Sequence, residues 1–361
     1  MKALTLHGSK DLRLEEVPPP APDPGTVIVR VLAAPVWDYI PEVISGARDY
    51  PLEMPLIFGT CCVGRIEQAG PDTTLKPGQL VFCDYIVRLR ESPDQRIVLG
   101  YHGGMTPHEL EFSSGYWKNG CFAELARFPV ENVHAVDETK VARYGSLNQL
   151  AEIASLMPSM GAANAIDVRA GETVIVIPAT GFFSSSAVVV ALALGANVVA
   201  GSRSRESLDA LITHLGDDGR RVTPVALTGD TELDSVNLRN ATPGGQGADA
   251  YIDYSPPGAA STTHIVAGLM ALKRYGRCCF AGVILDNVSL PYALIMANCL
   301  TLRGQFAQSR QDVVQTVRLI EAGVLKLRKT IVGPFPLEQH DLVMRLAGES
   351  RGWEKMVLFG P

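Results

Sequence analysis

The sequence predicts an α/β protein in two parts, a β-rich unit and a parallel sheet covered by helices. The chain has 361 residues, which is more than one ordinary domain needs and enough for two hydrophobic cores. Short strands separated by proline and glycine fill about the first 130 residues. From Ser146 to about Leu302, strands alternate with helices, which is typical of a parallel sheet with both faces covered.

The β-rich part contains apolar, β-branched segments at 26–33 and 62–69. Turn signals follow one another closely around them, and no long helical pattern lies between the strands. This spacing favours a small barrel or sandwich. The proline and glycine turn signals stand at 18–20, 22, 24–25, 70–71 and 77–78.

The central part begins with helical periodicity over 147–157 and 158–167. Short apolar strands then recur, separated by segments long enough for helices, which predicts a parallel sheet covered on both faces. The predicted strands are 173–177, 197–200, 222–227, 250–252, 277–281 and 301–304.

The last part returns to strand character. An amphipathic helix is predicted over 310–322, and strands are predicted at 331–336 and 355–359. The simplest division is one domain made from 1–145 and 305–361, with a second domain, 146–304, inserted into it.

Composition narrows the class of partner. The net charge is −6, and nucleic acids and anionic membranes both favour clustered Lys and Arg. The start of the chain has no apolar signal segment, and the longest apolar run, 187–200, is too short to cross a bilayer. We therefore expect a cytoplasmic protein that binds a small molecule and neither nucleic acid nor membrane.

Cysteine usage fits the same picture. The seven cysteines are an odd number, include two adjacent pairs and form no C-x-x-C motif. This spacing suits neither a disulfide framework nor a zinc knuckle. We expect buried, reduced thiols that pack as small apolar groups.

The segment 173–205 carries the clearest functional signal, because its pattern is strand, tight turn, helix and strand. Such a helix start attracts a pyrophosphate. The G-x-G-x-x-G fingerprint is reduced here to Ala179, Gly181 and Ser184. Two interpretations of the serines stay open, as phosphate donors or as caps of the helix. The candidate cofactor residues of this turn are Thr180, Gly181, Phe182, Phe183 and Ser184.

The residues at the end of the second strand of this unit indicate whether it binds NAD or NADP. An acidic residue there selects NAD, whereas a 2′-phosphate needs small and cationic residues. Ser202, Arg203 and Arg205 stand at this point, and the first acid is Glu206. The sequence therefore favours NADPH, with a solvated arginine loop as the alternative.

Across nearly its whole length the chain resembles the medium-chain dehydrogenase/reductase superfamily. The resemblance implies a GroES-like β-barrel catalytic domain and a Rossmann dinucleotide-binding domain. It also implies nicotinamide contacts at Gly282, Val283 and Phe306, and a homodimer formed through an edge strand at 292–302. The segments that carry it are KPGQLVF (76–82), GCFAELARFPVENVHAVDE (120–138), AGETVIVIPATG (170–181), LGANVVAGSR (195–203), GADAYIDYSPP (247–257), YGRCCFAGV (275–283) and LTLRGQF (300–306).

The zinc ligands of the alcohol dehydrogenase branch do not carry over. Their positions fall on Trp37 and Thr60, which are not zinc ligands, and only Asp38 and Cys61 remain as donors. The lobe that holds a second zinc in that branch is also missing. We therefore expect no metal, with Trp37, Thr60 and Cys61 shaping the substrate pocket. This places the chain nearer to the zinc-independent quinone oxidoreductases, enoyl reductases and fungal-type alcohol dehydrogenase-like proteins.

Without a metal, hydrogen bonds must bind the substrate and a protein group or water must deliver the proton. Tyr39 and Tyr50 are the candidate donors implied by the resemblance, and Asp38 is placed to orient Tyr39 or to bind substrate. The expected activity is NADPH-dependent reduction of a small or medium apolar carbonyl or α,β-unsaturated compound. The alternative is a non-redox enzyme (a cyclase, isomerase or dehydratase) or a binding protein on the same fold, in which Phe182 and Phe183 fill the pyrophosphate space.

Overall fold

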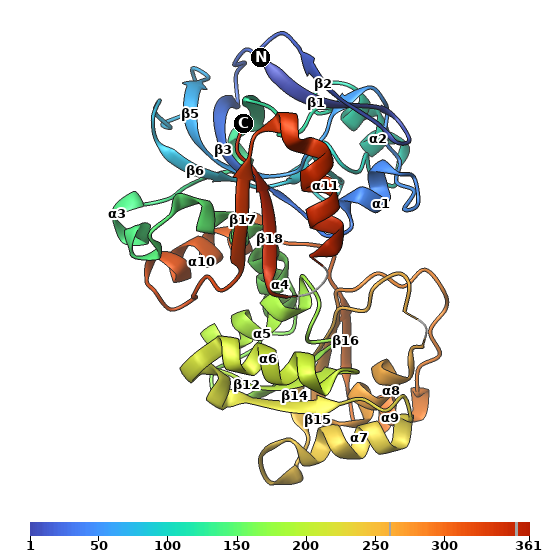
Figure 1. Ribbon diagram of the computed structural model, residues 1–361. Coiled ribbons are helices and arrows are strands. Elements are labelled where there is room, and N and C mark those ends of the chain that lie inside the picture. The colour runs from blue at the N-terminus through green and yellow to red at the C-terminus, as the bar shows by residue number, and fades with distance from the viewer. Residues whose placement is uncertain (260, 351–352) are drawn as a thin grey trace.

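The computed structural model describes residues 1–259, 261–350 and 353–361. Figure 1 shows two parts, one above the other. The upper part holds both termini and most of the antiparallel strands, and the lower part holds a parallel sheet with helices on it. No helix within the described residues is both long enough and apolar enough to span a bilayer.

The upper part is built around a sheet whose main path runs β10-β6-β5-β3-β18-β17, with β9 also paired to β3. Its last strands come from the other end of the chain. β18 (Lys355–Phe359) pairs antiparallel with β3 (Thr26–Val36) and parallel with β17 (Thr330–Phe335). The tail is therefore part of the same β structure as the first residues.

Smaller sheets complete this part, in the orders β2-β1-β4 and β7-β8. The remaining strands of the upper part are β1 (Lys2–Gly8), β2 (Asp11–Glu16), β4 (Leu56–Ile57), β5 (Cys62–Ala69), β6 (Leu80–Cys83), β7 (Ile86–Arg88), β8 (Arg96–Val98), β9 (Leu125–Pro129) and β10 (Val133–Ala135).

The lower part is a parallel sheet in the order β13-β12-β11-β14-β15-β16. The first strand lies in the middle and the connections run outward in both directions, as in doubly wound nucleotide-binding folds. All side chains of β11 (Thr173–Ile177) are buried, because helices cover both faces. The other strands are β12 (Asn197–Ser202), β13 (Val222–Ala226), β14 (Ala248–Asp253), β15 (Leu272–Phe280) and β16 (Thr301–Gly304).

Helices connect these strands and join the two parts. The α-helices are α1 (Ile40–Ile44), α2 (Pro107–Ser114), α3 (Glu138–Val141), α4 (Ile153–Ala165), α5 (Ser184–Ala193), α6 (Arg205–Leu215), α7 (Thr231–Asn240), α8 (Thr263–Met270), α9 (Tyr292–Ala297), α10 (Arg310–Glu321) and α11 (His340–Glu349). The 3₁₀ turns are η1 (Val130–Asn132), η2 (Ala142–Tyr144), η3 (Leu147–Glu152), η4 (Gly216–Arg221), η5 (Pro243–Gly245) and η6 (Leu337–Gln339).

Several predicted segments differ in their bounds, for example β15, which begins at Leu272 and not at 277, and two differ in kind. The apolar run 292–302 was expected to give the edge strand, but its first half forms α9 and only β16 occupies the edge. Residues 147–157 begin as the 3₁₀ turn η3 before α4 starts. In 147–157 the apolar residues after Leu147 are buried as expected, whereas α9 has no buried residue, so in 292–302 the apolar run predicted neither the backbone geometry nor the burial.

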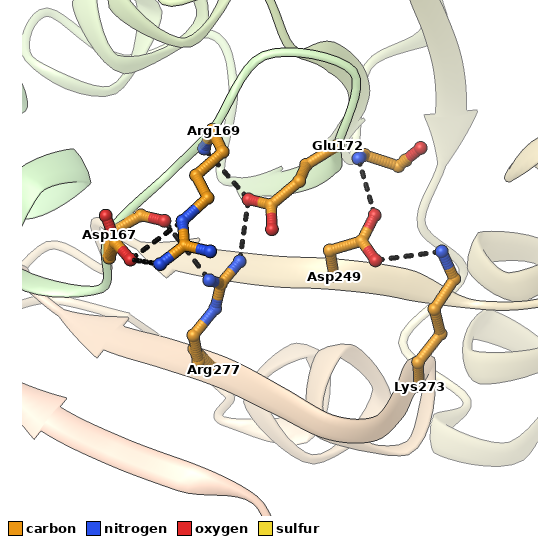
Figure 2. A network of polar contacts seen from close by, with 7 residues as sticks. Asp167, Arg169, Glu172, Asp249, Lys273 and Arg277 are labelled. Carbon is orange, nitrogen blue, oxygen red and sulfur yellow. Dashed lines mark hydrogen bonds and ion pairs between the residues drawn. The ribbon is translucent and has the colours of Figure 1, made fainter.

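A charged network joins the segments around the amino ends of the parallel strands (Figure 2). Arg277 Nη2 donates to Glu172 Oε2 at 2.7 Å. The carboxylate of Asp249 accepts a hydrogen bond from the Thr173 amide at 2.8 Å and forms an ion pair with Lys273 at 2.9 Å. These pairs join the strands at the amino edge of the sheet, and the opposite, carboxyl edge is the one at which doubly wound sheets generally bind ligands.

Candidate functional site

The candidate site begins at the turn between β11 and α5, on the carboxyl edge of the sheet. The hydroxyls of Thr180 and Ser202 are 2.8 Å apart and join the ends of the first two strands. The Ala179 amide also donates to the Gly201 carbonyl at 2.8 Å. The turn and the strand end predicted to hold the cofactor therefore form one surface.

The three serines at the start of α5 are buried and bonded within the protein. Ser184 Oγ accepts the Gly181 amide at 2.9 Å, and Ser186 Oγ donates to Ser155 Oγ of α4 at 2.9 Å. Ser185 Oγ donates to the Phe182 carbonyl. These hydroxyls hold the turn, and among the described side chains none caps the N-terminus of α5.

The two phenylalanines of the turn have different surroundings. Phe182 is buried, with Lys329 Nζ 4.5 Å from its ring centroid. Phe183 is half-buried and packs on Trp37 and Tyr39, with ring centroids 5.6 and 6.3 Å away. Phe183 therefore connects the turn to the aromatic side chains of the upper part.

Lys329 is a site residue that the sequence did not indicate. Its side chain is buried, and Nζ donates to the carbonyls of Phe182 and Trp353, both at 2.9 Å. Burial lowers the Lys329 pKa to about 8, against the opposing charges of Glu152 and Asp38. The Glu152 carboxylate accepts the amides of Arg328 and Lys329 at 2.6 and 2.8 Å. Lys329, the residue before β17, thus anchors the turn between β11 and α5.

Aromatic residues distant in sequence meet at Trp37. Its ring centroid lies 5.8 Å from that of Tyr39, 5.2 Å from Tyr85 and 5.3 Å from Tyr101. Tyr50 reaches the same group through Tyr101, at 5.2 Å. We call Trp37, Tyr39, Tyr50, Tyr85, Tyr101 and Phe183 the aromatic cluster.

Burial shifts the pKa values of two ionisable groups at this cluster upward. Burial raises the Tyr39 pKa well above its usual range, and it also raises the Asp38 pKa, against the charges of Lys329 and Arg48. The Arg48 guanidinium lies 4.2 Å from the Tyr39 ring centroid and donates to Glu42 at 3.1 Å. Tyr39 therefore keeps its proton at neutral pH.

The positions that the resemblance assigns to zinc ligands hold a different set of groups. Trp37 is buried, and Thr60 donates to Cys61 Sγ at 3.5 Å. Burial raises the Cys61 pKa well above its usual value, which disfavours the thiolate. In the part of the chain that the structure describes, no group of three or more His, Cys, Asp or Glu is placed to hold a metal ion.

The remaining predicted cofactor residues spread along the same edge. Arg203 and Arg205 are both exposed, and Arg205 Nε donates to Asp209 at 2.9 Å. Beyond β15, the Val283 amide donates to the Ser255 carbonyl at 2.9 Å. A Cβ at Gly282 would lie 2.4 Å from the Ser255 amide nitrogen, so this close approach requires glycine. Phe306 is exposed, and the Arg96 guanidinium lies 4.9 Å from its ring centroid.

The structure brings Trp37, Tyr39 and Tyr50 together and adds Tyr101 and Lys329, which sequence reasoning missed. Tyr101 belongs to the segment that replaces the second zinc lobe, where no spacing singles it out. Lys329 is one lysine among several near the tail. Only their burial and contacts, which depend on the tertiary fold, reveal them.

A cavity of about 920 Å³ lies elsewhere in the upper part. Arg88, Arg90 and Arg310 line it together with Phe112 and Trp117, and its described lining includes none of the predicted site residues. The cavity's size alone therefore does not identify the reaction centre.

Comparison with known proteins agrees with this geometry. Residues 23–138 match the family model "Alcohol dehydrogenase GroES-like domain". An acryloyl-coenzyme A reductase of Sulfurisphaera tokodaii is 26% identical, with 94% of each chain covered. A short chain alcohol dehydrogenase from E. coli CFT073, solved with NADH, superposes with a TM-score of 0.78 at 18% identity, covering 100% of this chain and 99% of the other. A protein from Sinorhizobium meliloti 1021 bound to NADP gives a TM-score of 0.79 at 18% identity with the same coverage. The predicted fold class is confirmed.

Proposed function

Since the chain belongs to the medium-chain dehydrogenase/reductase superfamily, we propose that it is an NADPH-dependent reductase that works without zinc. Its substrate is a small or medium apolar carbonyl or α,β-unsaturated compound. The observation that carries the proposal is the aromatic cluster around Trp37. Packing and hydrogen-bonding side chains stand where the resemblance places metal ligands. The family names of the relatives, dehydrogenases and acryloyl-coenzyme A reductases, support the reaction class.

The residues at the carboxyl edge fit a nicotinamide cofactor, which when bound supplies a hydride to the substrate. The uncapped start of α5 offers its amides and dipole to the pyrophosphate. Ser202 and the exposed Arg203 replace the acid that would select NAD, and a guanidinium suits a 2′-phosphate. Gly282, Val283 and Phe306 would contact the nicotinamide end, and Thr180, Gly181 and Ser184 shape the turn.

Tyr39 would donate the proton that completes the reduction. It contacts both Trp37 and Phe183, so it lies between the substrate position and the cofactor turn. Tyr50 is farther from the turn and packs on Tyr101 and His102. Asp38, neighbouring Tyr39 in sequence, would orient that tyrosine, while Thr60 and Cys61 would close the pocket floor.

A second candidate function rests on one observation, the packing of Phe183 against Trp37 and Tyr39. If this ring stays in place, it separates a nucleotide bound at the turn from a substrate bound at the aromatic cluster. The fold would then serve a non-redox reaction such as isomerisation or dehydration, with Tyr39 and Asp38 as acid and base. Turnover by protein stripped of nucleotide would favour this candidate.

Thermal unfolding with each nucleotide tests the proposal. NADPH should raise the melting temperature more than NADH at equal concentration, because only a bound ligand stabilises the native state. Arg203→Ala should weaken NADPH binding about tenfold and leave NADH binding unchanged. Arg205→Ala is the matched control, because Asp209 already holds that guanidinium. Absence of a shift with either nucleotide would refute the reductase.

We also propose the division into 1–145 with 305–361 and 146–304, and a homodimer. The six-stranded parallel sheet falls within 173–304, which supports the boundaries. Thr301, Arg303 and Gly304 of the edge strand β16 are exposed, and an unpaired edge favours association with a second copy.

A further inference from the structure

Two hydrogen-bond donors in the aromatic cluster lack partners. Within the described residues, five buried side-chain polar atoms have no hydrogen bond: Thr5 Oγ1, Trp37 Nε1, Tyr101 OH, His134 Nε2 and Gln308 Oε1. The Trp37 and Tyr101 rings pack with centroids 5.3 Å apart. The other three atoms lie on separate segments of the chain.

An unpartnered buried polar atom costs about 1–3 kcal/mol. Trp37 and Tyr101 are 2% and 4% exposed, so bulk solvent does not reach either donor. The Tyr39 hydroxyl interacts with that of Tyr101 and affects its pKa, yet no hydrogen bond of normal geometry reaches the Tyr101 hydroxyl. Two neighbouring donors left unpaired at such a cost point to an acceptor supplied from outside the chain.

We propose that Trp37 Nε1 and the Tyr101 hydroxyl together bind the carbonyl oxygen of the substrate. This inference rests on the proposed function and names its substrate class, a planar conjugated carbonyl compound. The two donors would hold the oxygen and stabilise the negative charge that grows on it when hydride arrives at the conjugated system. The surrounding rings of Tyr39, Tyr50 and Phe183 favour a flat, unsaturated body.

Phe183 is the side chain that this ligand displaces. Its ring covers Trp37 and also touches Tyr39. It precedes the first residue of α5, so its movement is coupled to the nucleotide turn. The substrate oxygen thus accepts its hydrogen bonds beside the cofactor, and Tyr39 lies close enough to donate the proton.

The test uses the full chain with cinnamamide, an unsaturated amide whose carbonyl oxygen is a good acceptor, and with cinnamaldehyde as the reducible probe. Binding of cinnamamide is measured by calorimetry with and without NADPH. Tyr101→Phe and Trp37→Phe each remove one donor and should weaken cinnamamide binding about tenfold. Both should lower kcat/KM for cinnamaldehyde, with NADPH affinity unchanged.

Stability separates this role from simple packing. Tyr101→Phe removes an unpaired hydroxyl, so the ligand-free variant should melt about 1–2 °C higher than wild type. Tyr144→Phe is the control, because the Tyr144 hydroxyl donates to the Leu325 carbonyl at 3.1 Å. This control should melt lower and bind cinnamamide normally.

Unchanged cinnamamide affinity in both donor variants, or no binding of cinnamamide by wild type, would overturn the inference. A lower melting temperature for Tyr101→Phe would also overturn it, since the hydroxyl would then have a partner. Failure of the reductase proposal gives a different result. NADPH would not shift the wild-type melting temperature, yet cinnamamide would still bind and depend on both donors.

Discussion

At the residue scale, the cluster around Trp37 shows how neutral side chains can stand where a metal site is expected. Trp37 and Tyr39 are close in sequence, whereas Tyr101 comes from the segment that replaces the second zinc lobe. Burial keeps Tyr39 protonated by raising its pKa. An enolate or alkoxide formed nearby is basic enough to take a phenolic proton, so this arrangement suits reduction.

Tyr39→Phe should lower kcat about 100-fold, because it removes the proposed general acid. The rate is measured under NADPH saturation with cinnamaldehyde, and the NADPH dissociation constant should stay the same. Tyr50→Phe is the matched comparison. It should change kcat less than about threefold, because this hydroxyl has no proposed part in the proton transfer. The reverse order of the two variants would assign the proton donor to Tyr50.

At the scale of elements, the sequence predicted strands better than it predicted the site. The bounds of β5, β16 and β18 agree with the expected 62–69, 301–304 and 355–359, because each strand is a short apolar run beside turn residues. The segment 292–302 was wrong in its first half, because the same apolar residues suit the helix α9. A strand bounded by turn residues can be predicted from its local sequence. Whether a short apolar run forms a helix or a strand depends on its tertiary contacts as well.

The site depends on contacts that no local pattern encodes. The fingerprint turn located the candidate cofactor edge, and the resemblance located Trp37 and Tyr39. Lys329 is different, since its role follows from burial beneath the turn and from carbonyls contributed by Phe182 and Trp353. A buried lysine cannot be recognised from its neighbours in sequence, because surface lysines have the same neighbours.

Lys329, which precedes β17 and bonds the turn before α5, predicts that the stability of the protein depends on pH. The folded pKa of Lys329 is about 8, below its ordinary value of 10.5. Between these values the folded lysine has lost its proton while the unfolded one keeps it, so this group adds stability as the pH rises. Relative to Lys329→Met, wild type should gain up to about 3 kcal/mol in free energy of unfolding from pH 8 to pH 10.5.

Chemical denaturation of wild type and Lys329→Met at several pH values measures this gain. Groups that do not interact with Lys329 titrate alike in both proteins, so their contributions cancel in the difference. Parallel stability curves for the two proteins would mean that Lys329 titrates normally in the folded state. The variant should also be less stable at pH 7, because Glu152 loses its compensating charge.

At the scale of the whole molecule, the upper and lower parts are held together by the segment before β17. Lys326 and Arg328 pair with Asp218 at 2.9 and 2.5 Å, and the Arg328 carbonyl contacts His214 at 2.5 Å. Both partners lie just before or within the turn after α6, and Lys329 holds α5. This segment therefore helps to position the candidate cofactor edge relative to the aromatic cluster, together with other contacts such as that of α10 with α4.

The opposite side of the parallel sheet predicts assembly. Beside the edge strand β16, Leu285, Tyr292 and Met296 are 84%, 81% and 63% exposed, and a second copy would cover them. A twofold axis at β16 would pair the edge with its own copy and join the two sheets.

Light scattering should therefore give a dimer, and Tyr292→Glu combined with Met296→Glu should give a monomer. Met105→Glu, which alters a methionine that is 80% exposed in the upper part, should remain dimeric. NADPH should still bind the monomer, because the cofactor edge lies at the strand ends and not along β16. A monomeric wild type, or a double variant that stays dimeric, would move the interface elsewhere.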